Sequence, residues 1–155
     1  MPCLPKLLRL APLALLASAA AAAEVGPCGE LNPIDNLVGQ VKAYSQGKIR
    51  VAHVDTGGEP VCCSSHLLVL VPNIETGGGT LCFAVSDEAG RDEKAARGFS
   101  TIDLSRIASS YDPQHGLLLT VPYSLYDLKA GRPGRSAFFR VRIDLRDADP
   151  VTIER

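Results

Sequence analysis

The feature that most constrains the fold is a strict alternation of apolar and charged side chains near the C-terminus. The alternating residues are Phe139, Val141, Ile143 and Leu145 against Arg140, Arg142, Asp144 and Arg146. Because successive side chains of a β-strand point to opposite faces, this spacing predicts a strand with one face on a core and the other in water. Antiparallel sheets commonly have one face on the core and the other in solvent, so we expect the chain to contain an antiparallel sheet.

Short apolar segments separated by turn residues predict further strands. These segments are residues 49–54, 66–71, 80–85, 99–104, 116–121 and 151–154. Stretches rich in glycine and polar residues provide connections at 55–59, 72–79 and 129–134. Because the predicted strands do not alternate with helices, a parallel sheet of β-α-β units is not expected.

An N-terminal helix is predicted at about 33–46. Asn32 is a typical N-cap, Pro33 suits the first helical position and Gly47 provides a stop. Apolar residues recur between them at helical spacing, at Ile34, Leu37, Val38, Val41 and Tyr44. The expected class is therefore mainly β, an antiparallel sandwich or curved sheet of about six to seven strands with one N-terminal helix. The alternative is an α+β fold with that helix packed on a single sheet.

Residues 1–23 have the pattern of a secretory signal peptide. Lys6 and Arg9 precede a short apolar run, and the alanine tract ending at Ala23 supplies small residues for cleavage. The run is too short to span a membrane, because a spanning helix needs about 20 apolar residues. We therefore expect residues 24–155 to form a single mainly-β domain, periplasmic or secreted, with no membrane span after cleavage.

The charge balance argues against a nucleic-acid partner. The full chain has 16 basic and 17 acidic residues, and removal of Lys6 and Arg9 leaves 14 basic against 17 acidic residues, a net charge of −3. Binding to a phosphate backbone requires a marked excess of positive charge. The chain also contains no Trp, so aromatic platforms for stacking bases or sugars are poorly supplied.

Four cysteines remain in the expected mature domain. In an exported protein Cys28, Cys62, Cys63 and Cys82 are expected to form two disulfides, with three possible connectivities. If Cys62 and Cys63 lie on a strand, they point to opposite faces and need different partners. The expected hairpin registers place Cys82 far from both unless the chain bends at residues 64–65. Otherwise Cys28 bonds one member of the pair and two thiols remain.

A metal site and a redox site are alternatives at this cluster. Thiolate and imidazole groups of His53, Cys62, Cys63 and His66 suit copper(I) or zinc, as in a metal carrier. However, the expected hairpin puts His53 opposite about residue 61, far from His66, whereas metal ligands must converge on one ion. The cysteine pair also lacks the C-x-x-C spacing of thiol–disulfide exchange proteins. No metal or cofactor is therefore assigned.

Two further patterns, for a hydrolase site and for a calcium site, are weaker evidence of function. A small hydrolase would use Ser64 or Ser65 with His66 or His115, but no nucleophile-elbow sequence surrounds either serine. Asp87 and Glu88, with Asp92 and Glu93, offer oxygen ligands to calcium. Basic residues interrupt that acidic stretch and the EF-hand spacing is missing, so a solvated loop is favoured.

Arginines form the last candidate site. Arg140, Arg142 and Arg146, with Arg132 and Arg135 in the preceding loop, could bind an anionic partner. Neighbouring aspartates can neutralise this row, so a salt-bridged sheet face is the favoured interpretation.

These observations favour a small exported protein that binds a protein or small-molecule partner and has no enzymatic activity. Copper or zinc carriage is the first alternative, and a small secreted hydrolase is the second. Loops at 55–59, 72–79, 86–98 and 129–135 are expected to carry specificity, because loops on a rigid β scaffold commonly do.

Overall fold

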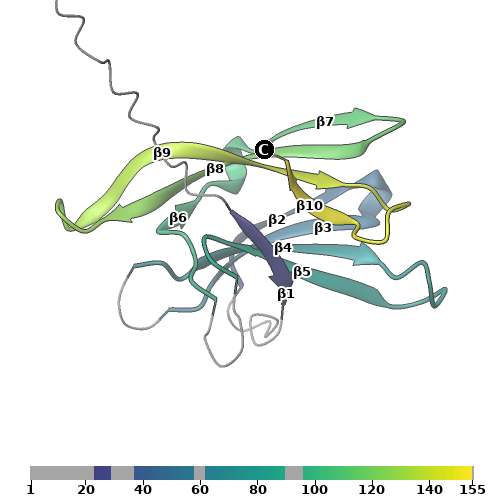
Figure 1. The fold of residues 1–155 in the computed structure, drawn as a ribbon, viewed down its shortest axis with the longest axis horizontal. Coiled ribbons are helices and arrows are strands. Elements are labelled where there is room, and N and C mark those ends of the chain that lie inside the picture. Colours follow the sequence, from purple (N-terminus) through teal and green to yellow (C-terminus); the bar gives the residue numbers. More distant parts are fainter. Residues whose placement is uncertain (1–22, 29–36, 58–61, 90–95, 155) are drawn as a thin grey trace, which may run out of the picture.

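Two antiparallel β-sheets stacked face to face form the fold in the computed structural model of the chain (Figure 1). The structure describes residues 23–28, 37–57, 62–89 and 96–154. The mainly β class predicted from the sequence is confirmed, and the sandwich is the arrangement observed. In the part of the chain that is described, no helix is long and apolar enough to cross a membrane.

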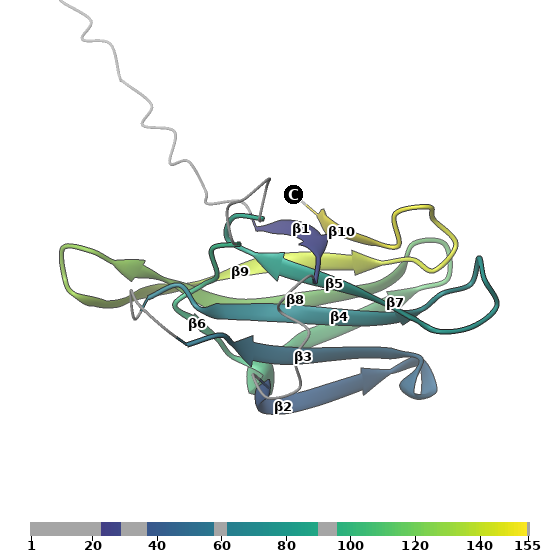
Figure 2. The same ribbon diagram turned by 90° about the horizontal axis from the view of Figure 1, so that it is seen from below.

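The first sheet has five strands in the order β1-β5-β4-β3-β2 (Figure 2). The bounds are β1 Glu24–Pro27, β2 Leu37–Tyr44, β3 Ile49–Asp55, β4 Ser65–Pro72 and β5 Thr80–Ser86. Every neighbouring pair is antiparallel. The apolar segments predicted as strands at 49–54, 66–71 and 80–85 therefore lie side by side in the middle of this sheet. β1, which the sequence pattern does not predict, forms one edge.

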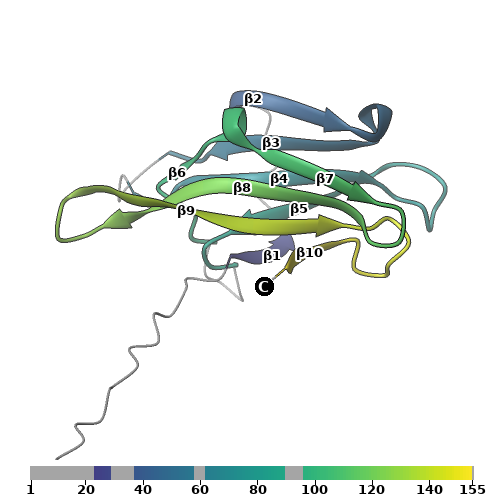
Figure 3. The ribbon, with the colours of Figure 1, turned by 90° about the horizontal axis from the view of Figure 1, so that it is seen from above.

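The second sheet is built around the long antiparallel pair β8–β9 (Figure 3). The bounds are β6 Thr101–Ile102, β7 Ala108–Asp112, β8 Gly116–Asp127, β9 Arg132–Ile143 and β10 Val151–Glu154. β10 pairs with β9, while β7 and β6 pair with successive parts of β8. Two 3₁₀ turns, η3 Ser45–Gly47 and η4 Leu104–Arg106, complete the elements of the described residues.

The core lies between the two sheets and consists of alternate residues of their strands. Val51 and Val69 of the first sheet and Val121 and Val141 of the second are all fully buried in it. These positions belong to the segments predicted as strands, and their alternate placement in the core follows the two-residue periodicity of a β-strand.

An aromatic cluster fixes the connection that follows β5. The fully buried ring of Phe99 lies with its centroid 4.8 Å from that of Tyr123 in β8 and 5.1 Å from that of Phe139 in β9. The backbone of Phe99 pairs with Ser65 at the start of β4, with N···O distances of 2.7 and 3.0 Å. This connection is therefore attached to both sheets.

The helix predicted at about 33–46 is wrong where the structure describes it, because β2 and the short η3 occupy those residues. Its first residues lie outside the described part of the chain. Burial alternates along β2, with Lys42 and Tyr44 half-buried and Val41 and Ala43 exposed. The physical reason is that backbone pairing with β3 outweighs a helical spacing made partly of β-branched residues, which are weak helix formers.

β8 and β9 project beyond the rest of the sandwich as a hairpin, whose residues 125–135 we call the arm (Figures 1 and 2). A β-bulge between Ser124 and Tyr126 lies at its root. At its tip, Asp127 Oδ1 accepts hydrogen bonds from the backbone N–H groups of the two residues before Gly131, at 2.9 and 3.0 Å. Gly131 has φ 64°, a left-handed conformation that suits glycine. The tip is therefore a defined turn.

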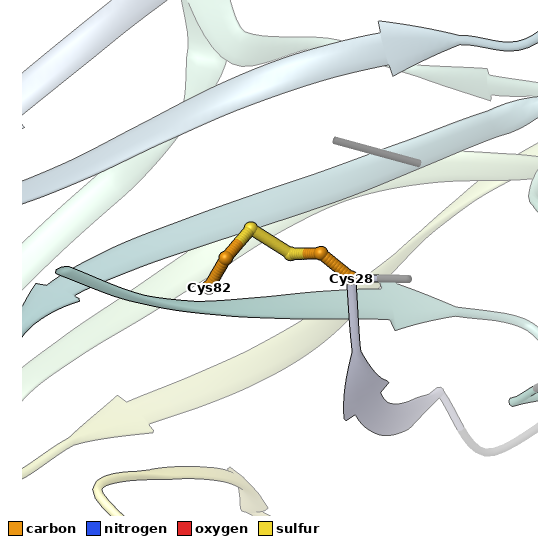
Figure 4. Close-up of a disulfide and its surroundings, with 2 residues drawn as sticks. All are labelled: Cys28 and Cys82. Atoms are coloured by element: carbon orange, nitrogen blue, oxygen red, sulfur yellow. A yellow bond between two sulfur atoms is a disulfide. The ribbon is translucent and has the colours of Figure 1, made fainter. Parts of the chain in front are cut away.

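A disulfide ties the end of β1 to the sheet (Figure 4). Cys28 follows β1 directly and bonds to Cys82 in β5, with the Cα atoms 5.5 Å apart. Cys62 and Cys63 are thiols, so the structure differs from the two disulfides expected from the sequence. The strand geometry assumed for Cys62 and Cys63 required each of them to have a different partner, whereas in the structure Cys28 and Cys82 bond to each other instead. The disulfide is compatible with an oxidising compartment, whereas export itself stays a prediction.

Candidate functional site

Three of the four loops expected to carry specificity lie at one end of the sandwich, which we call the loop end. The β3–β4 connection, the β5–β6 connection and the arm are at this end, and the connection at 72–79 is at the other (Figures 1 and 2). Residues 58–61 and 90–95 of the first two lie outside the described residues. Most of the predicted functional side chains are therefore at or near the loop end.

Cys62 and Cys63 lie in the bend that precedes β4. Both are half-buried thiols, and their side chains hydrogen-bond to each other. The alternation of a strand does not apply to them, because Cys63 has the left-handed φ of 75°. Burial raises the pKa of the Cys63 thiol to about 11, and the neighbouring Cys62 adds to the rise. Cys63 is therefore a neutral thiol at pH 7.

The predicted metal ligands do not assemble. His53 pairs with Leu67 across β3 and β4, and His66 is the next residue along β4. The two histidines are thus closer than the sequence predicted, but they point to opposite faces of the sheet. Among the described residues, no group of three or more His, Cys, Asp or Glu side chains could hold a metal ion. The geometry does not support the copper or zinc carrier.

His66 bonds instead to Ser86, a residue that the sequence did not single out. Its Nδ1 lies 2.8 Å from Ser86 Oγ, and both residues are 1% exposed. Ser65 is also buried. The Ser64 hydroxyl donates to the carboxylate of Asp55, which lowers the pKa of that carboxyl group. A buried Ser–His pair gives a substrate no access to a nucleophile, so the hydrolase alternative gains no support.

We expect His66 to make the protein less stable in mild acid. Burial lowers the pKa of His66 to about 4, from about 6.5 in an unfolded chain. Between these values the unfolded chain binds more protons, so stability falls as the pH falls through this window. The titration of His66 should lower the free energy of unfolding by about 2–3 kcal/mol between pH 7 and pH 4.5. Urea unfolding at these two pH values measures the loss.

The variant His66→Gln keeps an amide near Ser86 but does not titrate. It should be less stable at pH 7 and lose less stability between pH 7 and 4.5 than the unaltered chain. His115→Gln is the control, because the side chain of His115 is 67% exposed, whereas burial lowers the pKa of His53 as it does that of His66. An equal loss of stability in the unaltered chain and His66→Gln would contradict the assignment.

A buried carboxylate organises the β5–β6 connection. Asp87 is 7% exposed, and its Oδ2 accepts hydrogen bonds from Arg97 Nε at 3.0 Å and Nη2 at 2.5 Å. Arg97 also forms an ion pair with Glu88 at 2.9 Å. These two acids are therefore occupied by a guanidinium, and residues 92–93 lie outside the described residues, so calcium binding gains no support.

The arginines at the C-terminal end of β9 and just after it are already paired. Both Arg140 and Arg142 lie 2.5 Å from a carboxylate oxygen of Glu154 in β10. Arg146 lies 2.6 Å from Asp144, and its guanidinium lowers the pKa of that carboxyl group to about 2. The salt-bridged face favoured from the sequence is thus observed for these three arginines.

The arm, by contrast, carries positive charges without an ion-pair partner. Lys129, Arg132 and Arg135 are exposed, and none of them forms an ion pair among the residues the structure describes. Leu128 is 85% exposed at the tip. The arm therefore presents three cations and an apolar side chain to solvent, with Asp127 already engaged by the turn.

A small hollow lies at the root of the arm. Its volume is about 190 Å³, and it is lined by Tyr123, Leu125, Tyr126, Asp127, Gly134, Arg135 and Ala137. Small-molecule sites usually measure about 300–1,000 Å³, so this hollow suits a single side chain of a larger partner. One of the cations of the arm, Arg135, is among the lining residues.

Two larger hollows lie outside the loop end. A groove of about 860 Å³ lies between β1 and β10 and includes Cys82, which is held in the disulfide. A hollow of about 450 Å³ includes His115, whose ring lies 3.2 Å from Asp112. His115 follows β7, at the end of the sandwich opposite the loop end, so it cannot act with Ser64 (Figure 1).

Comparison of the chain with protein-family models, with curated proteins and with solved structures finds no match. The sequence pointed to the cysteines, the histidines and the basic loop. It did not show that Ser86 holds His66, that Arg97 holds Asp87, or that only some of the arginines are paired. These facts depend on contacts between distant residues, for which a single sequence contains no signal.

Proposed function

We propose that the chain is an exported binding domain, without enzymatic activity, that recognises an acidic segment of another protein through the arm. The observation that carries this proposal is the contrast in pairing between the arginines of β9. Arg140 and Arg142 are neutralised by Glu154, whereas Arg132 and Arg135 have no ion-pair partner within the described residues. Unpaired cations can bind carboxylates without breaking an internal ion pair.

The shape of the arm supports the same proposal. Asp127 and Gly131 hold the tip in a defined turn, so little conformational entropy is lost when a partner binds. The hollow at the root lies beside Arg135 and accepts one side chain. The partner segment that fits is therefore a short run of Asp or Glu that includes one large apolar residue.

An anionic membrane is the less favoured partner, because the binding free energy expected from the arm alone is small. Three cations near an anionic surface contribute about 1 kcal/mol each. Burial of Leu128 adds about 2 kcal/mol. The sum of about 5 kcal/mol corresponds to a Kd of roughly 0.2 mM, which is marginal for a single contact. A protein segment adds direct hydrogen bonds to the guanidinium groups and fills the hollow.

The test uses an acidic peptide with one central Phe, titrated into the mature chain and followed by NMR. We expect shifts confined to the arm and the hollow. The triple variant Lys129→Glu, Arg132→Glu, Arg135→Glu should bind at least tenfold more weakly, about 1.4 kcal/mol, with unchanged stability. The control is Lys48→Glu, Arg50→Glu, which reverses two exposed cations at the opposite end of the sandwich.

Phosphatidylglycerol vesicles provide the competing measurement. If the chain sediments with the vesicles but the peptide gives no shifts at the arm, the membrane is the partner and the proposal is wrong. Equal peptide binding by the triple variant and the control variant would also overturn it, because the arm would then not be the contact surface.

A further inference from the structure

The bend before β4 brings two thiols into contact at neighbouring positions. Cys62 and Cys63 hydrogen-bond to each other and are both partly accessible to solvent. Cys63 has φ 75°, which L-residues other than glycine, Asn and Asp rarely adopt. Such backbone strain persists only where the surroundings hold it, and it is concentrated at functional positions.

The surroundings hold this backbone on both sides of the bend. Gly98 N donates to the carbonyl of Cys63 at 2.7 Å, and Thr56 N donates to that of Ser64 at 3.0 Å. A Cβ atom at position 98 would lie 2.8 Å from the Cys63 carbonyl oxygen, so only glycine fits there. The contact between the thiols is therefore a built feature of the loop end.

We propose that Cys62 and Cys63 are a reversible redox couple that closes into a disulfide between neighbouring residues. Neighbouring Cα atoms are about 3.8 Å apart across a trans peptide. Most disulfides join Cα atoms about 4.4–6.8 Å apart, so this ring is strained and easily reduced. Cys28 and Cys82, at 5.5 Å, lie within the usual range. Among the described cysteines, Cys28 and Cys82 thus form a structural disulfide, and Cys62 and Cys63 form a labile pair.

The oxidant in this step is a disulfide, RS–SR, of a small molecule or another protein. The Cys62 thiol loses a proton, and its thiolate attacks one sulfur, forming a mixed disulfide and releasing the first RS⁻. Cys63 then loses its proton and attacks Cys62 Sγ, which forms the ring and releases the second RS⁻. The two RS⁻ groups take up the two protons, so a dithiol and RS–SR give a disulfide and two RSH.

The surroundings of the two cysteines decide which thiol reacts first with the oxidant. Burial raises the pKa of Cys63, so its thiolate is scarce at neutral pH and Cys62 is the first to attack. Once the mixed disulfide is in place, Cys63 is already in contact with the sulfur that it must attack. Ring closure is then intramolecular and is favoured over a second reaction with RS–SR.

The test is a titration of the mature chain, with its Cys28–Cys82 bond intact, in buffers of reduced and oxidised glutathione. Acid quenching, alkylation and peptide mass mapping report each cysteine. We expect the peptide holding Cys62 and Cys63 to carry two alkyl groups in reducing buffers and, in more oxidising buffers, to carry none and to be about 2 Da lighter than its unalkylated dithiol form. The pair should be reduced again in buffers that leave Cys28–Cys82 oxidised.

Two single variants and one backbone probe complete the test. Cys62→Ser and Cys63→Ser should each accumulate one glutathione adduct on the remaining thiol. In the unaltered chain the amide of Gly98 should shift on oxidation, because it donates to the Cys63 carbonyl, while the amide of Gly47 at the opposite end stays unchanged. Two alkylated thiols in the most oxidising buffer, two glutathione adducts, or a disulfide between two chains would each overturn the proposal.

Discussion

Replacement of Phe99 by alanine is expected to lower the free energy of unfolding by about 4 kcal/mol. The ring is fully buried, packs against Tyr123 and Phe139, and joins the β5–β6 connection to both sheets. Small domains are stable by about 5–15 kcal/mol, so the variant should unfold at a markedly lower urea concentration. Equilibrium urea unfolding followed by circular dichroism measures the effect.

Phe138→Ala is the matched control for this prediction. It also removes a phenyl ring, but the ring of Phe138, in β9 next to Phe139, is 65% exposed on the outer face. We expect a change within about 0.5 kcal/mol. If the two variants are destabilised equally, the burial of Phe99 and its place in the core are wrong.

Removal of the disulfide by Cys28→Ser, Cys82→Ser is expected to cost about 4 kcal/mol. The two cysteines are 54 residues apart, and closing a loop of that length restricts the unfolded chain by about this amount on the chain-entropy model. The same urea experiment measures it, with Cys62→Ser, Cys63→Ser as the control. If both double variants lose the same stability, or neither loses more than 1 kcal/mol, the Cys28–Cys82 pairing is contradicted.

The sequence predicted the central strands because their side chains alternate or form short apolar runs. One predicted strand covers residues 116–121, whereas β8 runs on through Pro122 to Asp127, although a proline has no N–H to donate to a neighbouring strand. β8 continues because only the carbonyl of Pro122 is needed, which accepts from Asp103 N at 3.0 Å. The helix was mispredicted at β2, where spacing alone could not reveal that β3 offers backbone partners along the edge.

The candidate site was only partly predictable. The dense cysteines and the basic loop were visible as composition, but their geometry was not. Cys62 and Cys63 were assumed to lie on a strand, and no local signal shows that Cys63 takes a left-handed backbone. Whether an arginine is free depends on acids elsewhere in the chain, and Glu154 neutralises Arg142 from a different strand.

The outer strands of the first sheet also bear on how the protein behaves when it is concentrated. A long, flat edge strand presents peptide groups that can template pairing with a second chain and begin aggregation. β2 is the longer edge, and a bulge between Leu37 and Val41 interrupts its register. Lys42 points inward there, where its Nζ donates to the carbonyl of Ser105 at 3.4 Å. An inward lysine and a bulge both oppose the docking of another strand, so this edge favours a chain that stays dispersed.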